Sequence, residues 1–92
     1  MDITKILTIS TGHISENTRT MLDIEPHTDS MQLSVYTKGD YGWLIWVPDD
    51  CQNPNIPEDL QRCLQLAKDN ECEWLCLDCD GEEINNFNQY NW

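Results

Sequence analysis

Residues 57–78, PEDLQRCLQLAKDNECEWLCLD, decide the fold because they join an amphipathic helix to a short apolar strand. Pro57 is expected to open the helix at its first position, with Glu58 and Asp59 in the first turn, where the helix dipole favours acids. Asn70, which tolerates left-handed backbone, is expected to end it. Four apolar side chains have the spacing of one buried helical stripe: Leu60, Cys63, Leu64 and Ala67.

Working outward from this unit, the apolar patterns predict four strands. The strand after the helix covers residues 73–78. Residues 43–47, WLIWV, form a continuous apolar run, which is typical of a central strand covered on both faces. Residues 31–37 alternate between apolar and polar side chains, which is typical of a half-buried strand. Residues 3–9 are rich in β-branched side chains and predict the first strand.

A short helix is expected over residues 16–23, with Ser15 as its N-cap. The element order is therefore β-α-β-β-α-β, which predicts a single α+β domain over residues 1–92. The order fits the ferredoxin-like arrangement of two split βαβ units, in which two helices cover one face of an antiparallel sheet. A C-terminal hairpin arm is expected to follow, with a possible fifth strand near residues 83–87.

Charge is the strongest compositional feature of the chain. Seventeen acids against five bases give a formal net charge of −12. Residues 1–46 hold six acids and three bases, whereas residues 47–92 hold eleven acids and two bases, so the second half carries most of the negative field. Such a surface repels phosphate backbones. We therefore expect no direct nucleic-acid binding, and a partner with a basic surface.

The chain also lacks the sequence features of a membrane or secreted protein. No apolar run approaches the ~18 residues of a membrane span, and residues 1–10 do not resemble a signal peptide. We expect no membrane partner, a cytoplasmic location, and a monomer or weak dimer. Thiols stay reduced in that compartment, and an odd number of cysteines, five, argues against a disulfide framework.

Three cysteines have a spacing that deserves a chemical interpretation. Cys72, Cys76 and Cys79 follow the CxxxCxxC pattern that holds some iron–sulfur clusters. On a strand, however, the first two share one face and the third points the other way, so the thiols are not expected to converge. The other sulfur and imidazole donors lie far along the chain: Cys51, Cys63, His13 and His27. We interpret the cysteines as buried apolar side chains and expect no metal or cofactor.

The acids around Gly81 resemble the start of a calcium loop. In an EF-hand the glycine occupies the sixth position, but counting from Asp78 it occupies the fourth, so calcium binding is not expected. We interpret Asp80-Gly81 as the turn of a hairpin, in which both residues adopt positive φ values.

His13, in the stretch STGHIS at the end of the first strand, could act as a general base. No recognisable nucleophile motif completes a catalytic site. We therefore interpret His13 as a turn or capping residue and expect no enzymatic activity. A small thiol or metal-dependent enzyme built on Cys72, Cys76 and His13 is a third hypothesis.

Aromatic side chains gather in two parts of the sequence. The first group surrounds the central strand: Tyr41, Trp43 and Trp46. The second closes the chain: Phe87, Tyr90 and Trp92. A sheet with helices on one face leaves its other face open. Two alternatives follow, because either the aromatic tail folds over that face or a second protein covers it.

Five stretches carry a resemblance over most of the chain: STGHIS (10–15), YGWLIWVP (41–48), IPEDL (56–60), CEWLCLDCDG (72–81) and YNW (90–92). They resemble a family of short bacterial and mobile-element proteins of unknown function, some encoded beside plasmid-type toxin–antitoxin genes. That family has LDRDG where this chain has LDCDG, which implies that Cys79 is replaceable. The resemblance implies a setting on mobile bacterial DNA, where defence, counter-defence and toxin control are common functions.

These observations lead to a predicted function. We expect a non-enzymatic nucleic-acid mimic that binds a basic surface of a nucleic-acid-binding protein or complex, such as a phage or plasmid anti-defence inhibitor of a CRISPR or restriction complex in a bacterial host cell. The alternative is an antitoxin-like or accessory module that docks through its sheet face and aromatic tail. The predicted contact residues are eight acids and two tryptophans: Asp49, Asp50, Glu58, Asp59, Asp78, Asp80, Glu82, Glu83, Trp46 and Trp92.

Overall fold

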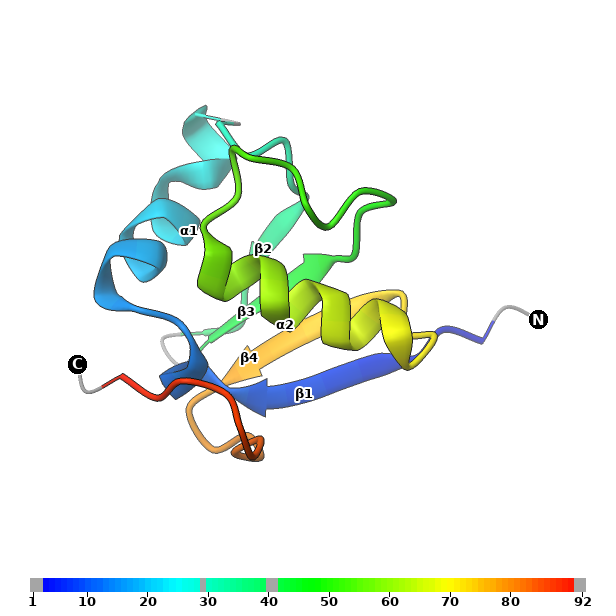
Figure 1. The fold of residues 1–92 in the computed structure, drawn as a ribbon. Helices are drawn as coiled ribbons and strands as arrows, with labels where there is room; N and C mark the ends of the chain where they lie inside the picture. The colour runs from blue at the N-terminus through cyan, green and yellow to red at the C-terminus, as the bar shows by residue number, and fades with distance from the viewer. Residues whose placement is uncertain (1–2, 29, 40–41, 91–92) are drawn as a thin grey trace.

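The computed structural model describes residues 3–28, 30–39 and 42–90. Within them, four strands and two α-helices follow one another in the predicted β-α-β-β-α-β order, which confirms the α+β class (Figure 1). One turn of 3-10 helix, η1, follows the first strand. The bounds are β1 Ile6–Ser10, η1 Thr11–His13, α1 Glu16–Thr28, β2 Val35–Thr37, β3 Gly42–Trp46, α2 Glu58–Asp69 and β4 Trp74–Asp78.

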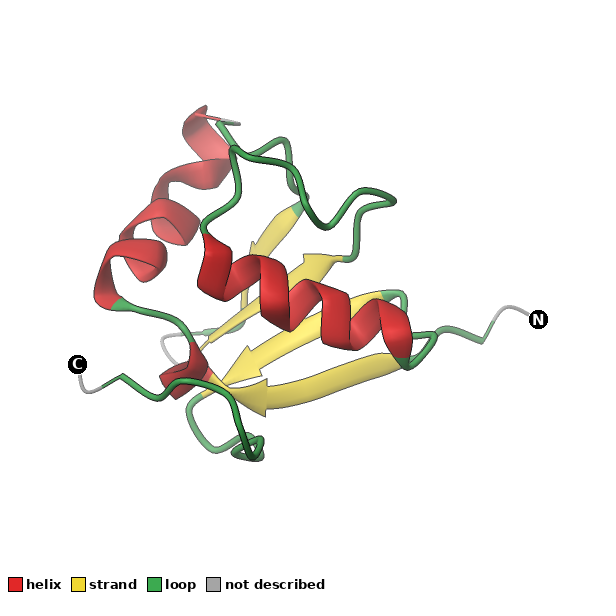
Figure 2. Ribbon diagram, viewed as in Figure 1, coloured by secondary structure: helices red, strands yellow, loops and turns green. Residues whose placement is uncertain are grey.

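The four strands form one sheet in the order β1-β4-β3-β2 (Figure 2). β4 pairs with β1 in parallel and with β3 antiparallel, and β2 pairs antiparallel with β3. The sheet is therefore mixed, and the predicted antiparallel sheet of the ferredoxin-like type is wrong. β3 is an inner strand, as its apolar run predicted.

The loop over residues 48–57 explains the difference in strand direction. Lys68, in the last turn of α2, donates a side-chain hydrogen bond to the carbonyl oxygen of Asp49, so the loop begins beside the C-terminal end of α2. The loop then returns along the helix to its first residue (Figure 1). β4 consequently starts at the end of the sheet where β3 finishes, and the two strands run antiparallel.

Both helices pack on one face of the sheet, as predicted, and bury a shared core against it. The strands contribute alternate residues to this core: Ile9, Val35, Trp43, Ile45, Leu75 and Leu77. The whole apolar stripe predicted for α2 is buried, and α1 adds Leu22. Trp43 donates an indole hydrogen bond to Asp23 of α1 at 3.2 Å, which helps to hold α1 over the same face.

The first helix begins as predicted and ends later than predicted. The hydroxyl of Ser15 accepts a hydrogen bond from the amide of Thr18, which is the predicted N-cap. α1 continues past residue 23 to Thr28, with Pro26 inside it. Pro26 has no backbone amide, so the last turn of α1 has one hydrogen bond fewer than a regular helix.

Glu25, near the end of α1, is a buried carboxylate with 1% of its surface exposed. Its two oxygens accept hydrogen bonds from the amides of Met31 and Leu33 at 3.1 Å. The hydroxyl of Ser30 donates a further bond at 3.2 Å. Because buried amides need acceptors, this one side chain fixes the loop that follows α1.

β2 is shorter than the strand predicted over residues 31–37. The predicted alternation is confirmed in burial, because Met31, Leu33 and Val35 all enter the core. Two of these amides, however, bond to the carboxylate at the end of α1 and cannot join a strand ladder. Gln32 between them has a φ of 55°, in the left-handed region. Regular strand geometry therefore starts only at Val35.

The ends of α2 differ slightly from the prediction. Pro57 is the N-cap and not the first helical residue, so the helix begins at Glu58. Asn70 has a φ of −96°, and the left-handed residue is Glu71, with a φ of 59°. Among the described residues, no helix has the length and apolar character needed to cross a membrane.

The C-terminal segment, residues 79–90, is not the predicted hairpin arm, and its described residues contain no strand. It meets the sheet at one parallel bridge between Ile9 and Glu82, where the amide of Ser10 donates to the carbonyl oxygen of Glu82 at 2.9 Å. Gly81 does not have the positive φ predicted for a hairpin turn. It is needed because a Cβ there would lie 2.4 Å from the backbone carbonyl of Ile9.

Candidate functional site

The sheet face opposite the helices, the open face, is apolar and partly exposed to solvent. The strand registers place Ser10, Asp78 and seven further side chains on it: Ile6, Thr8, Tyr36, Leu44, Trp46, Trp74 and Cys76. Ile6 is 52% exposed, Tyr36 58% and Trp46 43%. The apolar run of β3 had predicted a strand covered on both faces. This prediction is wrong, because β3 is covered on one face only. A contiguous exposed apolar surface on a small domain is typical of an interaction site.

Three of these side chains form an aromatic cluster: Tyr36, Trp46 and Trp74. The register of β3 and β4 pairs Trp46 with Trp74, and their rings meet edge to face with centroids 4.9 Å apart. The ring of Tyr36 lies 6.0 Å from that of Trp74. The sequence predicted Trp46 as an apolar anchor and missed the other two. Exposed rings with polar atoms are frequent anchors in protein interfaces.

The described part of the C-terminal segment does not cover the open face. Phe87 packs edge to face on His13, with ring centroids 5.6 Å apart, and the amide of Tyr90 donates to the carbonyl oxygen of Gly12 at 2.8 Å. Phe87 and α2 residues, including Gln65 and Leu66, line one open surface pocket of about 400 Å³, so the segment lies on the helix side of the sheet (Figure 1). The sheet face and the tail are thus not one docking surface. Trp92 lies outside the described residues.

An ion pair borders the open face. Lys38 Nζ lies 2.8 Å from an oxygen of Asp78 and 3.6 Å from the Sγ atom of Cys76. The hydrogen bond from Lys38 holds the pKa of Asp78 below its ordinary value, and the same bond raises the pKa of Lys38. Both groups stay charged throughout the neutral range. Asp78, a predicted contact residue, therefore has a partner within its own domain.

Asp59, a second predicted contact residue, joins the starts of the two helices. Its carboxylate accepts hydrogen bonds from the hydroxyl of Thr18 and the amide of Ser15, both at 2.7 Å. It also accepts one from the amide of Leu60 at 2.9 Å. Thr18 is 1% exposed. The main contacts of Asp59 are thus internal, and they hold α1 against α2.

The predicted acids other than Asp59 lie at two ends of the sheet. The acidic end, where β1 and β4 finish, has five members: Glu58, Asp78, Asp80, Glu82 and Glu83. Glu58 pairs with Arg62 one helical turn away at 3.1 Å, with both side chains exposed. Asp49 and Asp50 are exposed and follow β3, so they lie at the opposite end. The eight predicted acids therefore do not form one continuous surface.

The three closely spaced cysteines occupy different environments. Cys76 is 3% exposed and lies beneath the amine of Lys38. Cys72 is half-buried, with its thiol 3.6 Å from the carbonyl oxygen of Asn70. Cys79 is exposed in the turn after β4. The three thiols thus do not converge, as predicted. The shared face predicted for Cys72 and Cys76 is wrong, because Cys72 precedes β4 and packs against the helix-side core. Cys79 is not the buried side chain that was predicted.

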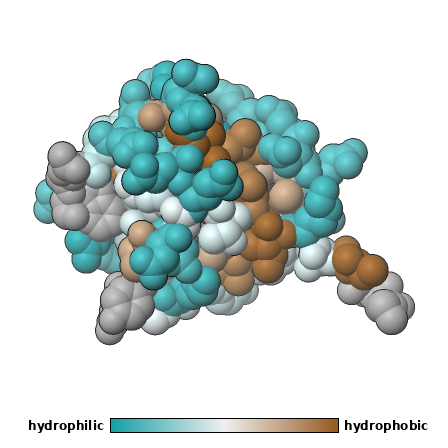
Figure 3. Space-filling view, turned by 90° about the horizontal axis from the view of Figure 1, so that it is seen from below, coloured by the Kyte–Doolittle hydropathy of each residue, from teal (hydrophilic) through white to brown (hydrophobic). Residues whose placement is uncertain are grey.

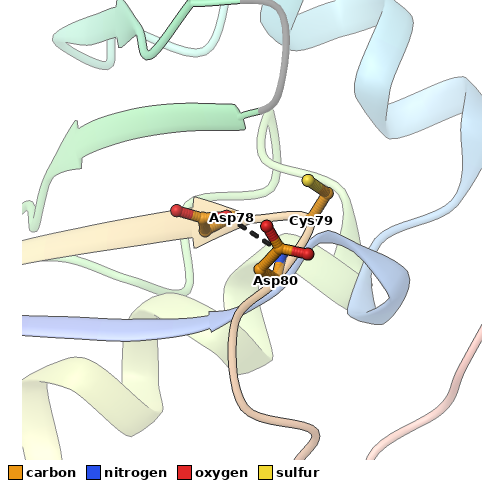
Figure 4. A group of neighbouring side chains, drawn as sticks. All are labelled: Asp78, Cys79 and Asp80. Atoms are coloured by element: carbon orange, nitrogen blue, oxygen red, sulfur yellow. Dashed lines mark hydrogen bonds between the residues drawn. The ribbon is translucent and has the colours of Figure 1, made fainter.

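A different group brings possible metal ligands together. Asp78, Cys79 and Asp80 each place one ligand atom within 4.8 Å of the others (Figure 4). The carboxylate of Asp78 already accepts hydrogen bonds from Lys38 and from the amide of Asp80, at 2.8 and 2.9 Å. These bonds account for the closeness of the group as an ordinary turn.

The cysteines are expected to differ strongly in reactivity. Burial raises the pKa of the Cys63 thiol to about 12 and also raises that of Cys51, and the thiolate is the reactive form. Titration of the native protein with a thiol reagent at neutral pH should show one fast thiol, Cys79, followed by Cys72. Cys79→Ser should remove the fast phase. A fast phase that survives this substitution would contradict the assignment.

His13 joins the C-terminal segment to the first strand. It is 2% exposed, and its Nε2 atom accepts a hydrogen bond from the amide of Ile84 at 2.8 Å. Its Nδ1 atom lies 3.0 Å from the carbonyl oxygen of Asn88, to which it donates. This pattern defines a neutral imidazole with the proton on Nδ1. Both ring nitrogens are engaged by backbone groups, so the imidazole holds the C-terminal segment against the turn that follows β1.

The fold and these contacts define a small α+β domain in which helices cover one face of a mixed sheet and aromatic side chains lie on the other. The chain belongs to the family of unknown function DUF5983, whose C-terminal domain matches residues 6–92. No curated protein and no solved structure matches it.

Proposed function

We propose that this domain is a non-enzymatic protein-binding module that docks through its open face onto a basic surface of another protein. The observation that carries the proposal is the aromatic cluster, in which Tyr36 and Trp46 are half-exposed on a sheet face that the described helices and tail leave uncovered. Burial of such rings against a partner removes apolar surface from water and supplies anchors for recognition.

Charge supports a basic partner. The domain carries a net charge of −12, and two of its five bases, Lys38 and Arg62, are already paired with acids. Exposed tryptophan and tyrosine rings also attract the cationic heads of arginine and lysine. A partner that combines apolar side chains with arginine or lysine would therefore match both the rings and the field around them.

A finer form of the proposal assigns the partner to a nucleic-acid-binding complex in a bacterial cell. In this form the protein is a nucleic-acid mimic encoded by a phage or plasmid, which inhibits a CRISPR or restriction complex in the cytoplasm of the host. The grouping of Glu58, Asp80, Glu82 and Glu83 at the acidic end favours it, because these carboxylates can occupy sites that normally bind phosphates. The alternative is an antitoxin-like or accessory module in which the open face provides the affinity and the charge is incidental.

Substitution of the open face tests the proposal. Trp46→Ala should weaken capture of a partner from a bacterial host lysate by about 30-fold or more, since an interface anchor contributes about 2 kcal/mol. Ile24→Ala is the matched control, because Ile24 is a similarly exposed apolar residue, 46% against 43%, and lies on α1. Affinity of the captured protein for each purified variant is then measured by calorimetry. Equal affinity for Trp46→Ala and the wild type would refute docking through the open face.

Salt separates the two forms of the proposal. Capture that falls steeply as salt rises supports nucleic-acid mimicry, because exposed charge pairs are screened beyond about 10 Å in 0.1 M salt. Glu82→Gln combined with Glu83→Gln should then weaken capture as well. Capture that is insensitive to salt and to both substitutions supports the accessory module.

A further inference from the structure

β1 lies at one end of the strand order, so one of its two backbone edges faces away from the sheet. The amide of Lys5 donates to the carboxylate of Glu73, and its carbonyl oxygen accepts from the amide of Glu73, so this residue faces β4. The amide of Ser10 instead points outward, to the carbonyl oxygen of Glu82. Backbone groups alternate along a strand. Ile6 and Thr8 therefore present their amides and carbonyls outward, where no described strand pairs with them.

This outer edge has few of the features that protect exposed strands from pairing. Residues 3–10, ITKILTIS, contain no proline and one charge, Lys5, whose amine is held by the carbonyl oxygen of Asn70. Ile3 and Ile6 are 80% and 52% exposed. A hydrophobic band crosses this side of the molecule when it is viewed from below (Figure 3). Between residues 3 and 8, the edge is thus apolar and has no partner among the described strands.

We propose that the outer edge of β1 pairs with the same edge of a second copy of this chain, which extends the sheet across a two-fold axis. The low negative charge of this edge favours self-association here over other parts of the surface. A chain with seventeen acids repels its own copies over most of its surface, but residues 3–10 contain no acid and one lysine. Two such edges approach without facing carboxylates on the strands themselves.

The geometry selects a register. In an antiparallel pair centred on Ile6, that residue faces Ile6 of the second copy, and Thr4 faces Thr8 on each side. The backbone amides and carbonyls of Thr4, Ile6 and Thr8 all point outward, so they can form hydrogen bonds with the second copy. The two Ile6 side chains then form a cross-strand pair. A register centred on Leu7 would instead pair Thr4 of the second copy with Ser10, whose outward amide already donates to Glu82. Within residues 3–10, the outward residues that the Ile6 register pairs are Thr4, Ile6 and Thr8, which no described strand uses.

Such pairing is isologous and closes on itself, so it yields a dimer and not a fibre. The open faces of the two copies then lie on the same side of one continuous eight-stranded sheet. The two charges of −12 still repel each other at a distance, so the dimer is weak at low salt and strengthens as salt rises. This dependence is opposite to that expected for a basic partner.

Sedimentation of the purified full chain tests the inference. The wild type should form a concentration-dependent dimer whose fraction increases between about 0.05 M and about 0.5 M salt, as repulsion is screened. Thr8→Pro removes an outward amide that the domain itself does not use, and proline is tolerated at sheet edges, so it should weaken dimerisation at least ~10-fold. Thr8→Ala keeps the amide and should leave dimerisation within about twofold of the wild type.

A second variant guards against a folding defect in Thr8→Pro. Ile6→Lys places two ammonium groups opposite each other across the two-fold axis and should also abolish the dimer, with thermal unfolding of the monomer as a check on its fold. A wild type that remains monomeric at high salt and high concentration would overturn the inference. So would a dimer that both variants preserve.

Discussion

Replacement of Glu25 by alanine is expected to lower the free energy of unfolding by about 3–5 kcal/mol, the largest loss we expect from one substitution in this domain. The change leaves the amides of Met31 and Leu33 buried without their acceptor. Each unmet buried donor costs about 1–3 kcal/mol, and the space left by the side chain adds to the loss. Urea denaturation followed by tryptophan fluorescence measures the change.

Glu16→Ala provides the matched control for this substitution. Glu16 lies in the first turn of the same helix and is exposed, so its loss removes a favourable interaction with the helix dipole and little else. The expected cost is below about 1 kcal/mol. If the two variants unfold at the same urea concentration, Glu25 does not fix the loop as described.

Gly81→Ala is expected to cost about 2–3 kcal/mol and to loosen the C-terminal segment. The new Cβ atom would lie 2.4 Å from the backbone carbonyl of Ile9, and neither backbone can move away without breaking the bridge at Glu82. Ile84 and Asn88, which bond to the ring of His13, come shortly after Gly81 in the sequence, so a shift at Gly81 should weaken these bonds. Faster hydrogen exchange at the amide of Ile84, beside the loss in urea stability, is the expected local signature.

Gly39→Ala is a control that distinguishes a steric clash of the new Cβ atom from the cost of an unfavourable φ value. Gly39 has a φ of 59°, which disfavours alanine, but nothing lies within 4 Å of the added Cβ atom. The expected cost is therefore about 1 kcal/mol, from conformation alone. A similar loss in both variants, with unchanged exchange at Ile84, would contradict the steric account of Gly81.

The elements that could be predicted from the sequence are those with a clear local period. The stripe from Leu60 to Ala67 repeats with the helical period, and all of it is buried in α2. The alternation of Met31, Leu33 and Val35 also predicted their burial. The same alternation wrongly predicted a strand that begins at residue 31. The amides of Met31 and Leu33 bond to the Glu25 side chain, and an apolar–polar alternation carries no information about such a contact.

Strand order and direction depended on features without a local signal. The proline-rich loop over residues 48–57 was predicted as a loop, but nothing in its composition indicates that it returns along α2. That return reverses β4 relative to a split βαβ unit and lets it enter between β1 and β3. The C-terminal segment has aromatic residues in a strand-like run, yet its position is set by contacts of His13 with distant backbone groups.

The candidate site could be predicted in part. Trp46 was predicted as an anchor because aromatic side chains with a polar atom are frequent anchors in interfaces, and it lies on the open face. Tyr36 and Trp74 join it through strand registers that only the assembled sheet defines. Counting acids likewise could not show that Asp59 bonds to Ser15 and Thr18, or that Asp78 pairs with Lys38.

The insertion of β4 between β1 and β3 also has a consequence for biosynthesis. Among the described strands, β1 pairs only with β4, and the contact of Lys5 with Glu73 spans 68 residues. As the chain leaves the ribosome, its β1 strand must wait for β4 to emerge before the two can pair. Closing so large a loop is slow. During that interval the nascent chain exposes a β-branched, acid-free segment, the kind on which chaperones act.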